Sequence, residues 1–356
     1  MNSKIERLLY SYLLESNFTK MEFSEDEVTE VTDIAWRYLL SGFILESNAG
    51  NYLNEKLANN LKDQRKVQLM KYLAAKHDLS EIATAFKENN IDFVVMKGMA
   101  LTIGGIYKPG VRGSRDIDIL VDKQEIGSAY KALRSIGFRY ENPKTLDNAN
   151  FLYGHHLPAM RNTQGTLVEL HWQVSNTFNI PHCPLTKAII NNKRELNQCP
   201  NIFIPDISAM MVHSLYHGLV SHRLGQGPIF LFDLLALYEA NNKKWPDNKK
   251  LLIELNLLED FSSCKSLIEA IIGQKPSFND FKELSKDIMG GFDWPTDARF
   301  SIFGISEKRT SLSYMIGSTM QRLNTVSNNY QISKKSFKFW ILLLNNLYVT
   351  CKKFKL

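Results

Sequence analysis

The sequence predicts an α+β fold, in which a small mixed β-sheet with flanking helices lies between helical N-terminal and C-terminal regions. Three patterns favour this class. Residues 91–96 form a compact apolar run enriched in β-branched side chains, which is typical of a buried strand. Residues 116–121 alternate two carboxylates with apolar residues, as a strand with one polar face does. Residues 155–172 contain two strand-like runs on either side of a turn at 162–165, which predicts a hairpin.

Chain length and composition set the wider frame. A chain of 356 residues has room for two domains, or for one domain with large helical additions. We expect an N-terminal helical region at 1–90, an α+β core at 91–205 and a C-terminal helical domain at 206–356. The net charge of +6 and the pI near 8.9 are compatible with phosphate-bearing ligands, and they do not favour nucleic acid as a partner.

Several features predict a cytoplasmic protein. Residues 1–6 lack the apolar core of a signal peptide, and no apolar run reaches the length that spans a membrane. The four cysteines are scattered without paired spacing, which predicts free thiols. His182 and Cys183 lie near Cys199, but this spacing does not favour a zinc site.

The first 90 residues read as helices. Ser24 and Glu27 form the pattern of a capping box, in which each side chain satisfies the backbone N–H of the other residue at a helix start. We expect a long helix over 52–75 and a further helix from Ser80 to Asn89-Asn90. This region carries no chemical motif, and packing or a lid is the expected role.

In the core, the strand at 91–96 ends at Lys97-Gly98, and a helix should open at Met99. Backbone N–H groups at such a helix start face outward and form a natural cradle for phosphate. The alternative is that Gly98 only permits a tight turn from strand to helix. A further helix is expected over 125–136, ended by Gly137, with a short strand at 138–140.

The pair Asp116 and Asp118 should project from one face of its strand, because strand side chains repeat every two residues. Two neighbouring carboxylates repel each other, and a divalent cation with oxygen ligands, such as Mg²⁺, is the usual compensation. The alternative is a polar strand edge. In the second hairpin arm, Glu169 and His171 likewise share a face, so a third carboxylate could complete a two-metal phosphoryl-transfer site. A polar outer face of the hairpin is again the alternative, and Pro158 makes the first arm an edge or interrupted strand.

Taken in order, these residues resemble the nucleotidyltransferase superfamily of DNA polymerase β type. The matching elements are a strand with a glycine turn, an acidic-x-acidic strand and a third acidic residue: Lys97-Gly98-Met99, Asp116-Ile117-Asp118 and Val168-Glu169-Leu170. Over residues 90–240 the chain more closely resembles a bacterial family of uncharacterised nucleotidyltransferases. That resemblance also rests on Tyr107, Pro109, Arg112, Gly137-Phe138, His155 or His156, and the block from Glu169 to Trp172.

The resemblance implies a nucleotidyltransferase that depends on Mg²⁺, with Mn²⁺ as the alternative metal, and that uses an NTP as substrate. It would move NMP to a hydroxyl or phosphate on an unidentified small-molecule or peptide acceptor, such as a sugar, sugar phosphate or modified peptide. Asp116, Asp118 and Glu169 would hold the metal. His171 would orient Glu169 or assist deprotonation of the acceptor, although packing beside Trp172 would explain it equally.

One departure bears on activity. The superfamily usually has a hydroxyl-bearing or glycine residue after the first-turn glycine, where this chain has Met99. Phosphate contacts would then come from the residues Lys97, Gly98, Arg112, Ser114 and Arg115. Two other functions stay open: a catalytically degenerate nucleotide-binding or partner-docking module, and toxin-like nucleotidyl transfer to protein or RNA.

The C-terminal region is helical from Asp206. His213 and His217 lie one turn apart, and we favour core or cleft-lining histidines over a zinc pair. The helix at 229–238 is apolar except for Asp233, which needs a buried partner; His217, His222 and Arg223 are the candidates. Residues 337–349 form an apolar segment between lysines, for which docking onto the protein is favoured over peripheral contact with an anionic membrane.

Overall fold

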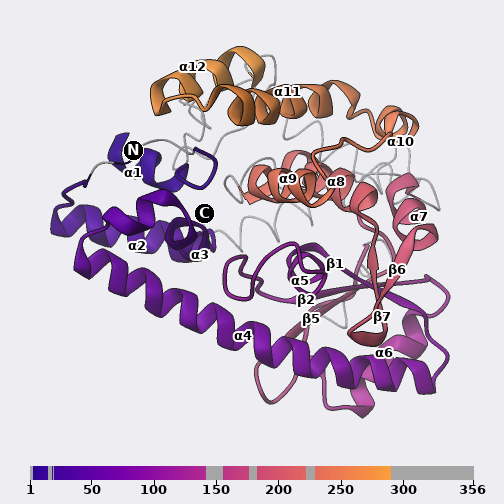
Figure 1. Cartoon of the computed structure of the whole chain (residues 1–356). Helices are drawn as coiled ribbons and strands as arrows, with labels where there is room; N and C mark the ends of the chain where they lie inside the picture. Colours follow the sequence, from indigo (N-terminus) through magenta and orange to yellow (C-terminus); the bar gives the residue numbers. More distant parts are fainter. Residues whose placement is uncertain are drawn as a thin grey trace, which may run out of the picture.

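A computed structural model of the chain describes residues 3–14, 18, 20–141, 155–175, 183–221 and 229–289. A mixed sheet lies at the centre, with the long helix α4 (Glu55–Glu88) and α6 (Ile126–Ser135) on one side, and α5 (Lys97–Ile103) with α8 (Ile207–Tyr216) on the other (Figure 1). The predicted fold class is therefore confirmed. The segment 337–349 lies outside the described residues, among which no helix is long and apolar enough to cross a membrane.

The N-terminal helices are α1 (Ser3–Leu9), α2 (Glu25–Arg37), α3 (Ser41–Glu46), the 3₁₀ helix η1 (Asn48–Tyr52) and α4. The predicted capping box at the start of α2 is confirmed: the Ser24 backbone N–H donates to the Glu27 carboxylate at 2.9 Å, and the Glu27 N–H donates to Ser24 Oγ at 3.3 Å. The two predicted helices at 52–75 and from Ser80 are one helix of 34 residues. Ser80 does not break it, because its hydroxyl donates back to the Lys76 carbonyl within the helix at 3.3 Å.

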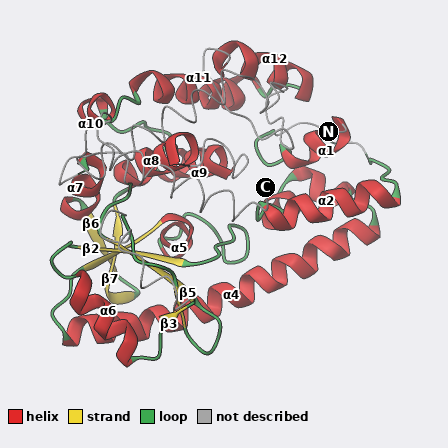
Figure 2. Cartoon of the chain, turned by 180° about the vertical axis from the view of Figure 1, so that it is seen from behind, coloured by secondary structure: helices red, strands yellow, loops and turns green. Residues whose placement is uncertain are grey.

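Within the described residues, seven strands form the sheet in the order β3-β4-β5-β2-β1-β7-β6. Their bounds are β1 Phe93–Met96, β2 Ile117–Val121, β3 Arg139–Tyr140, β4 Met160–Arg161, β5 Leu167–His171, β6 Lys193–Leu196 and β7 Cys199–Pro205. The sheet is mixed, because β2 runs antiparallel to β1 and parallel to β5. The view from behind shows its twist and the helices around it (Figure 2). The sequence did not predict the β6–β7 hairpin, which α7 (Pro184–Asn191) precedes.

The first arm of the predicted hairpin is interrupted, as Pro158 indicated. It pairs with β5 only through β4 and through an isolated bridge between His156 and His171. Two consecutive histidines, His155 and His156, lie at this interruption, and their rings are close to that of His171 on β5.

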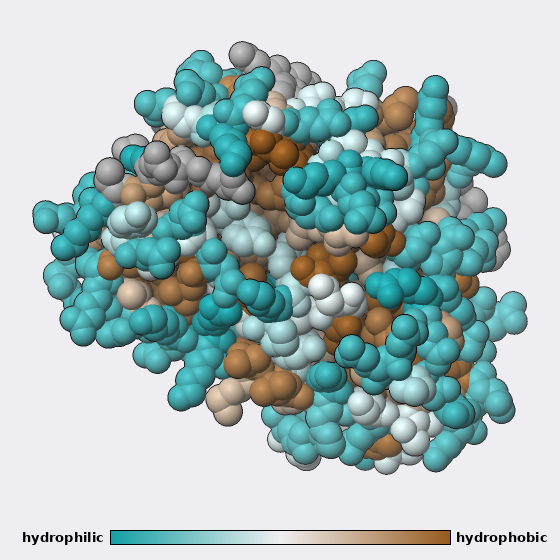
Figure 3. Space-filling view, viewed as in Figure 1, coloured by the Kyte–Doolittle hydropathy of each residue, from teal (hydrophilic) through white to brown (hydrophobic). Residues whose placement is uncertain are grey.

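The C-terminal part adds α8, a π-helical turn (His217–Ser221), α9 (Ile229–Ala240), α10 (Lys249–Glu254), α11 (Leu258–Gln274) and α12 (Phe278–Met289). An aromatic cluster joins α9 to the N-terminal helices: the ring of Phe43 lies 4.8 Å from that of Phe232 and 4.9 Å from that of Tyr12. Hydrophilic side chains cover most of the face in Figure 3, and hydrophobic ones gather toward its middle. Both helical regions therefore share one hydrophobic core with the sheet.

Candidate active site

The junction of β1 and α5 places a lysine side chain next to an aspartate of the sheet. Lys97 follows Met96 directly and has a φ of 54°, a left-handed conformation that few non-glycine residues adopt. Its ammonium group lies 2.6 Å from the Oδ1 atom of Asp118, the residue that pairs with Met96 across the sheet. Burial alone would lower the pKa of Lys97, but the carboxylate of Asp118 raises it. Lys97 is therefore a partly buried counter-ion for that aspartate.

The register of β2 and β5 places two carboxylates side by side. Asp118 pairs with Glu169, and Leu120 pairs with His171, so all three functional side chains share one face. His171 Nε2 lies 3.0 Å from Asp118 Oδ1 and 3.5 Å from Glu169 Oε2. The three residues bring one ligand atom each within 4.8 Å of the others. We call Asp118, Glu169 and His171 the carboxylate–histidine cluster.

Charges within the cluster stabilise one another. Burial favours a neutral Asp118, but Lys97 and His171 outweigh it and hold the pKa of that carboxyl well below its usual range. Burial would also lower the pKa of His171, whereas its bonds to Asp118 and Glu169 raise it. The hydrogen bond from His171 lowers the pKa of Glu169. Asp118 is 2% exposed, so its charge depends on these two partners.

Asp116 is in a different electrostatic situation. It precedes β2, is half-buried, and lies outside the cluster as defined by ligand-atom distances. Burial, together with repulsion from Asp118 and Glu169, raises its pKa to about 7. Lys97 and His171 thus offset only part of the repulsion between Asp116 and its two acidic neighbours.

Neutral histidines surround the cluster. The rings of His155 and His156 lie 5.6 and 4.9 Å from that of His171. Burial lowers the pKa of His155 to about 2, and it lowers that of His213, on α8, to about 3. His213 is therefore a buried histidine near the cleft, as the sequence indicated, although its place beside this cluster had no signal in the residue spacing.

The loop before β2 is held by a buried ion pair. Arg112 donates from Nε to Asp233 Oδ1 and from Nη2 to Asp233 Oδ2, both at 3.1 Å, and the Tyr107 hydroxyl donates to Oδ1 at 3.1 Å. Asp233 does need a partner, as its apolar helix implied, but the partner comes from this loop rather than from His217. His222 and Arg223 lie outside the described residues.

Gly98 has a packing reason for being glycine. A Cβ atom at this position would lie 2.7 Å from Arg112 Nη1, too close for an unchanged arrangement. Two further predicted phosphate contacts, Ser114 and Arg115, each donate one hydrogen bond to a backbone carbonyl. The Ser114 hydroxyl donates to the Asp116 carbonyl at 2.8 Å, and Arg115, which is exposed, donates to the Arg37 carbonyl.

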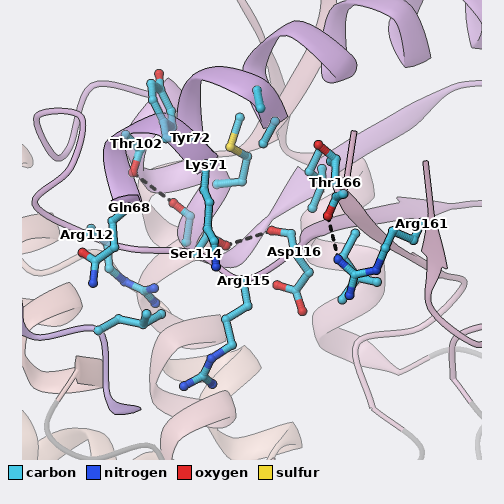
Figure 4. Close-up of a pocket in the computed structure, with 18 of the residues that line it drawn as sticks. Gln68, Lys71, Tyr72, Thr102, Arg112, Ser114, Arg115, Asp116, Arg161 and Thr166 are labelled. Carbon is cyan, nitrogen blue, oxygen red and sulfur yellow. Dashed lines mark hydrogen bonds between the residues drawn. The ribbon is translucent and has the colours of Figure 1, made fainter. Parts of the chain in front are cut away.

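A cavity of about 550 Å³ opens next to Asp116 (Figure 4). Its walls come from the end of α2, the middle of α4, α5, the 112–116 loop and the turn before β5. Gly98, Arg112, Ser114, Arg115 and Asp116 line it, whereas Lys97 and the carboxylate–histidine cluster do not. The structure thus divides the predicted site residues into two neighbouring groups, with Asp116 between them.

Comparison with known families settles the class of protein. A family model described as uncharacterised nucleotidyltransferase matches residues 25–273, which is more than half of the chain. The chain belongs to the uncharacterised nucleotidyltransferase family. A search of curated proteins found no match. The match begins at the first residue of α2 and ends within α11, so the family includes the helices on both sides of the sheet, beyond the 90–240 stretch of the sequence resemblance.

As a nucleotidyltransferase, the protein is a transferase whose acidic pair on adjacent strands fits the chemistry of the class. Asp118 and Glu169 could hold a cation jointly, because they lie side by side and Glu169 is 24% exposed on its side chain. The raised pKa of Asp116 indicates unrelieved negative charge at the same place, which a cation would neutralise. The carboxylates present therefore fit a divalent metal.

Proposed function

We propose that this nucleotidyltransferase moves NMP from an NTP to a hydroxyl or phosphate of a sugar, sugar phosphate or modified peptide. The observation that carries the proposal is the register of Asp118 with Glu169 on adjacent parallel strands, in a chain of this family. Asp116, Asp118 and Glu169 would hold Mg²⁺, with Mn²⁺ as the alternative. A divalent cation held there would stabilise charge on the attacking and leaving oxygens.

The chain's own residues would position the reaction. His171 orients both carboxylates through Nε2, and Lys97 keeps Asp118 ionised inside the protein. Glu169 is the most exposed residue of the cluster and thus the carboxylate best placed to receive the proton of an acceptor hydroxyl. Attack of the acceptor oxygen on the α-phosphorus would form one P–O bond, break the bond to the β-phosphate oxygen and release pyrophosphate.

The proposal also includes the cellular location of the enzyme and its contacts with the triphosphate. We propose that it works in the cytoplasm, where thiols stay reduced, since Cys183, Cys199 and Cys264 are all free. The three basic residues Lys97, Arg112 and Arg115, with Gly98 and Ser114, were expected to contact the triphosphate. Because Lys97 and Arg112 already have carboxylate partners, Arg115 is the member of this set with a charge left to offer.

A pyrophosphate-release screen tests the function directly. The purified full-length protein would be incubated with Mg²⁺ or Mn²⁺ and each NTP, against hydroxyl-bearing sugars, sugar phosphates and peptides. We expect release with at least one pair, and loss of release in Asp118→Asn. Protein and RNA acceptors in the same screen test the toxin-like alternative. NTP binding without turnover on any acceptor would contradict the proposal and support a binding module.

A further inference from the structure

The cavity beside Asp116 carries more positive than negative charge. Arg37, at the end of α2, Lys71, in α4, and Arg115 all line it, and none of them forms an ion pair among the described residues. Two further arginines of the lining are already neutralised, Arg112 by Asp233 and Arg161 by Glu141. Against the three remaining cations stands one carboxylate, that of Asp116. An anion is therefore the ligand that this charge distribution favours.

A buried amide in the same wall has no hydrogen-bond partner within the described ranges. Gln68 is 4% exposed, and neither its Nε2 nor its Oε1 atom has a hydrogen-bond partner in the part of the chain that the structure describes. Leaving such a group unsatisfied costs stability, so buried amides nearly always have partners. Figure 4 shows Gln68 beside Arg112, with Lys71 reaching toward Ser114 and Arg115. The unsatisfied amide and the three unpaired cations therefore line the same cavity.

The cavity has the size and walls of a small-molecule site. Its volume of about 550 Å³ falls within the usual range for such sites, roughly 300–1,000 Å³. Aromatic side chains from the N-terminal helices, Trp36 and Tyr72, supply apolar surface, and the Lys71 ammonium lies 5.5 Å from the centre of the Trp36 ring. The helices α2 and α4, for which the sequence indicated only packing or a lid, therefore form part of the wall of this cavity.

We propose that this cavity binds the phosphate groups of a substrate, with Lys71, Arg37 and Arg115 as counter-ions and the Gln68 amide as a hydrogen-bond donor. The proposal rests on the proposed function in that the phosphate belongs to a reactant, and Asp116 joins the cavity to the carboxylate–histidine cluster. Two reactants share this chemistry: the triphosphate of the NTP and the phosphate of a sugar phosphate acceptor. Lysine and arginine both suit phosphate, and the amide adds a directed contact.

Isothermal titration calorimetry of the full-length protein distinguishes the two phosphate-bearing reactants. One arm uses each NTP, a second uses glucose 1-phosphate, and a third uses inorganic pyrophosphate, all without divalent metal and then with Mg²⁺. We expect Lys71→Met to weaken binding of the phosphate ligand by roughly 10-fold or more. The control is Lys62→Met, which removes the same charge from the opposite side of α4 and should bind as the parent does. Equal affinities for both variants would overturn the proposal.

The amide gives a second, independent test. Gln68→Leu removes a buried polar group that has no hydrogen-bond partner among the described residues, so the variant's melting temperature should equal or exceed that of the parent. Its affinity for the phosphate ligand should nevertheless fall by roughly 5-fold, as expected for one lost hydrogen bond. A purely structural Gln68 would instead leave affinity unchanged, and that result would remove it from the site.

The same variants separate this inference from the proposed function. If the parent releases pyrophosphate and Lys71→Met and Gln68→Leu match its affinity and its rate, the cavity proposal is wrong and the function stands. If no acceptor supports transfer but phosphate binding is present and is lost in Lys71→Met, the cavity proposal stands and the function fails. Absence of phosphate binding in the parent, with and without Mg²⁺, overturns the cavity proposal.

Discussion

The ammonium group of Lys97 lies 2.6 Å from the Oδ1 atom of Asp118, inside the sheet and beside the imidazole of His171. This contact changes how the acidic pair should be understood. Asp118 is stabilised as an anion, and the unrelieved charge lies on Asp116, whose pKa is raised to about 7 by burial and by its two acidic neighbours.

Asp118→Asn should abolish pyrophosphate release and also destabilise the protein. The asparagine keeps the shape of the side chain but leaves the Lys97 ammonium without its carboxylate. We expect a loss of about 3 kcal/mol, the lower end for a broken buried pair, because Lys97 is 21% exposed. Chemical denaturation measures the change. A melting temperature equal to or above that of the parent would mean that relief of acidic repulsion outweighs the lost ion pair.

Asp116→Asn should raise stability at neutral pH and leave it unchanged near pH 4. The pKa of Asp116 is about 7 in the folded protein and about 3.8 for an ordinary aspartate, so the unfolded chain releases this proton first as pH rises. The parent therefore loses stability between about pH 4 and pH 7, and the variant lacks that loss. Melting temperatures of both proteins across this range give the difference. A constant difference at every pH would contradict the raised pKa.

Arg112→Ala should destabilise the protein by roughly 3–5 kcal/mol, because it leaves Asp233 buried and unpaired. Any change in the nucleotide affinity of the folded variant would then follow from displacement of the 112–116 loop. The double variant Arg112→Met with Asp233→Leu should recover much of the loss, since it removes both charges. Urea denaturation of Arg112→Met, Asp233→Leu and the double variant tests the coupling. Additive losses would show that the two residues stabilise the protein independently.

Glu169→Gln should lower the transfer rate by orders of magnitude while changing stability little. Its side chain is 24% exposed and lies 3.5 Å from His171 Nε2, so the fold depends on it less than on Asp118. NTP binding should persist, because Glu169 serves the acceptor side of the proposed reaction. Titration with NTP beside a pyrophosphate assay separates these quantities. A variant that retains the parent's rate would exclude Glu169 from catalysis.

Local patterns in the chain were enough for many of the elements. The capping box at Ser24 and Glu27, the apolar strand before Lys97, and the period-2 placement of Asp118 depend on interactions over a few residues, and all appear in the structure. The predicted break in the long helix before Ser80 was wrong. Helix α4 runs through Ser80 because nothing within it, neither proline nor glycine, interrupts the backbone hydrogen bonds.

The sequence by itself determined the family, the acidic residues and the strands that carry them, because side chains two residues apart on a strand must share a face. Only the tertiary structure decided which charges meet. Lys97 with Asp118, Arg112 with Asp233 across 121 residues, and Gln68 beside the 112–116 loop are contacts between separate elements. No local spacing encodes them, because each depends on how the sheet and the helices pack. Packing thus gave Lys97 and Arg112, the predicted phosphate contacts, carboxylate partners, and it placed α4 in the wall of the cavity beside Asp116.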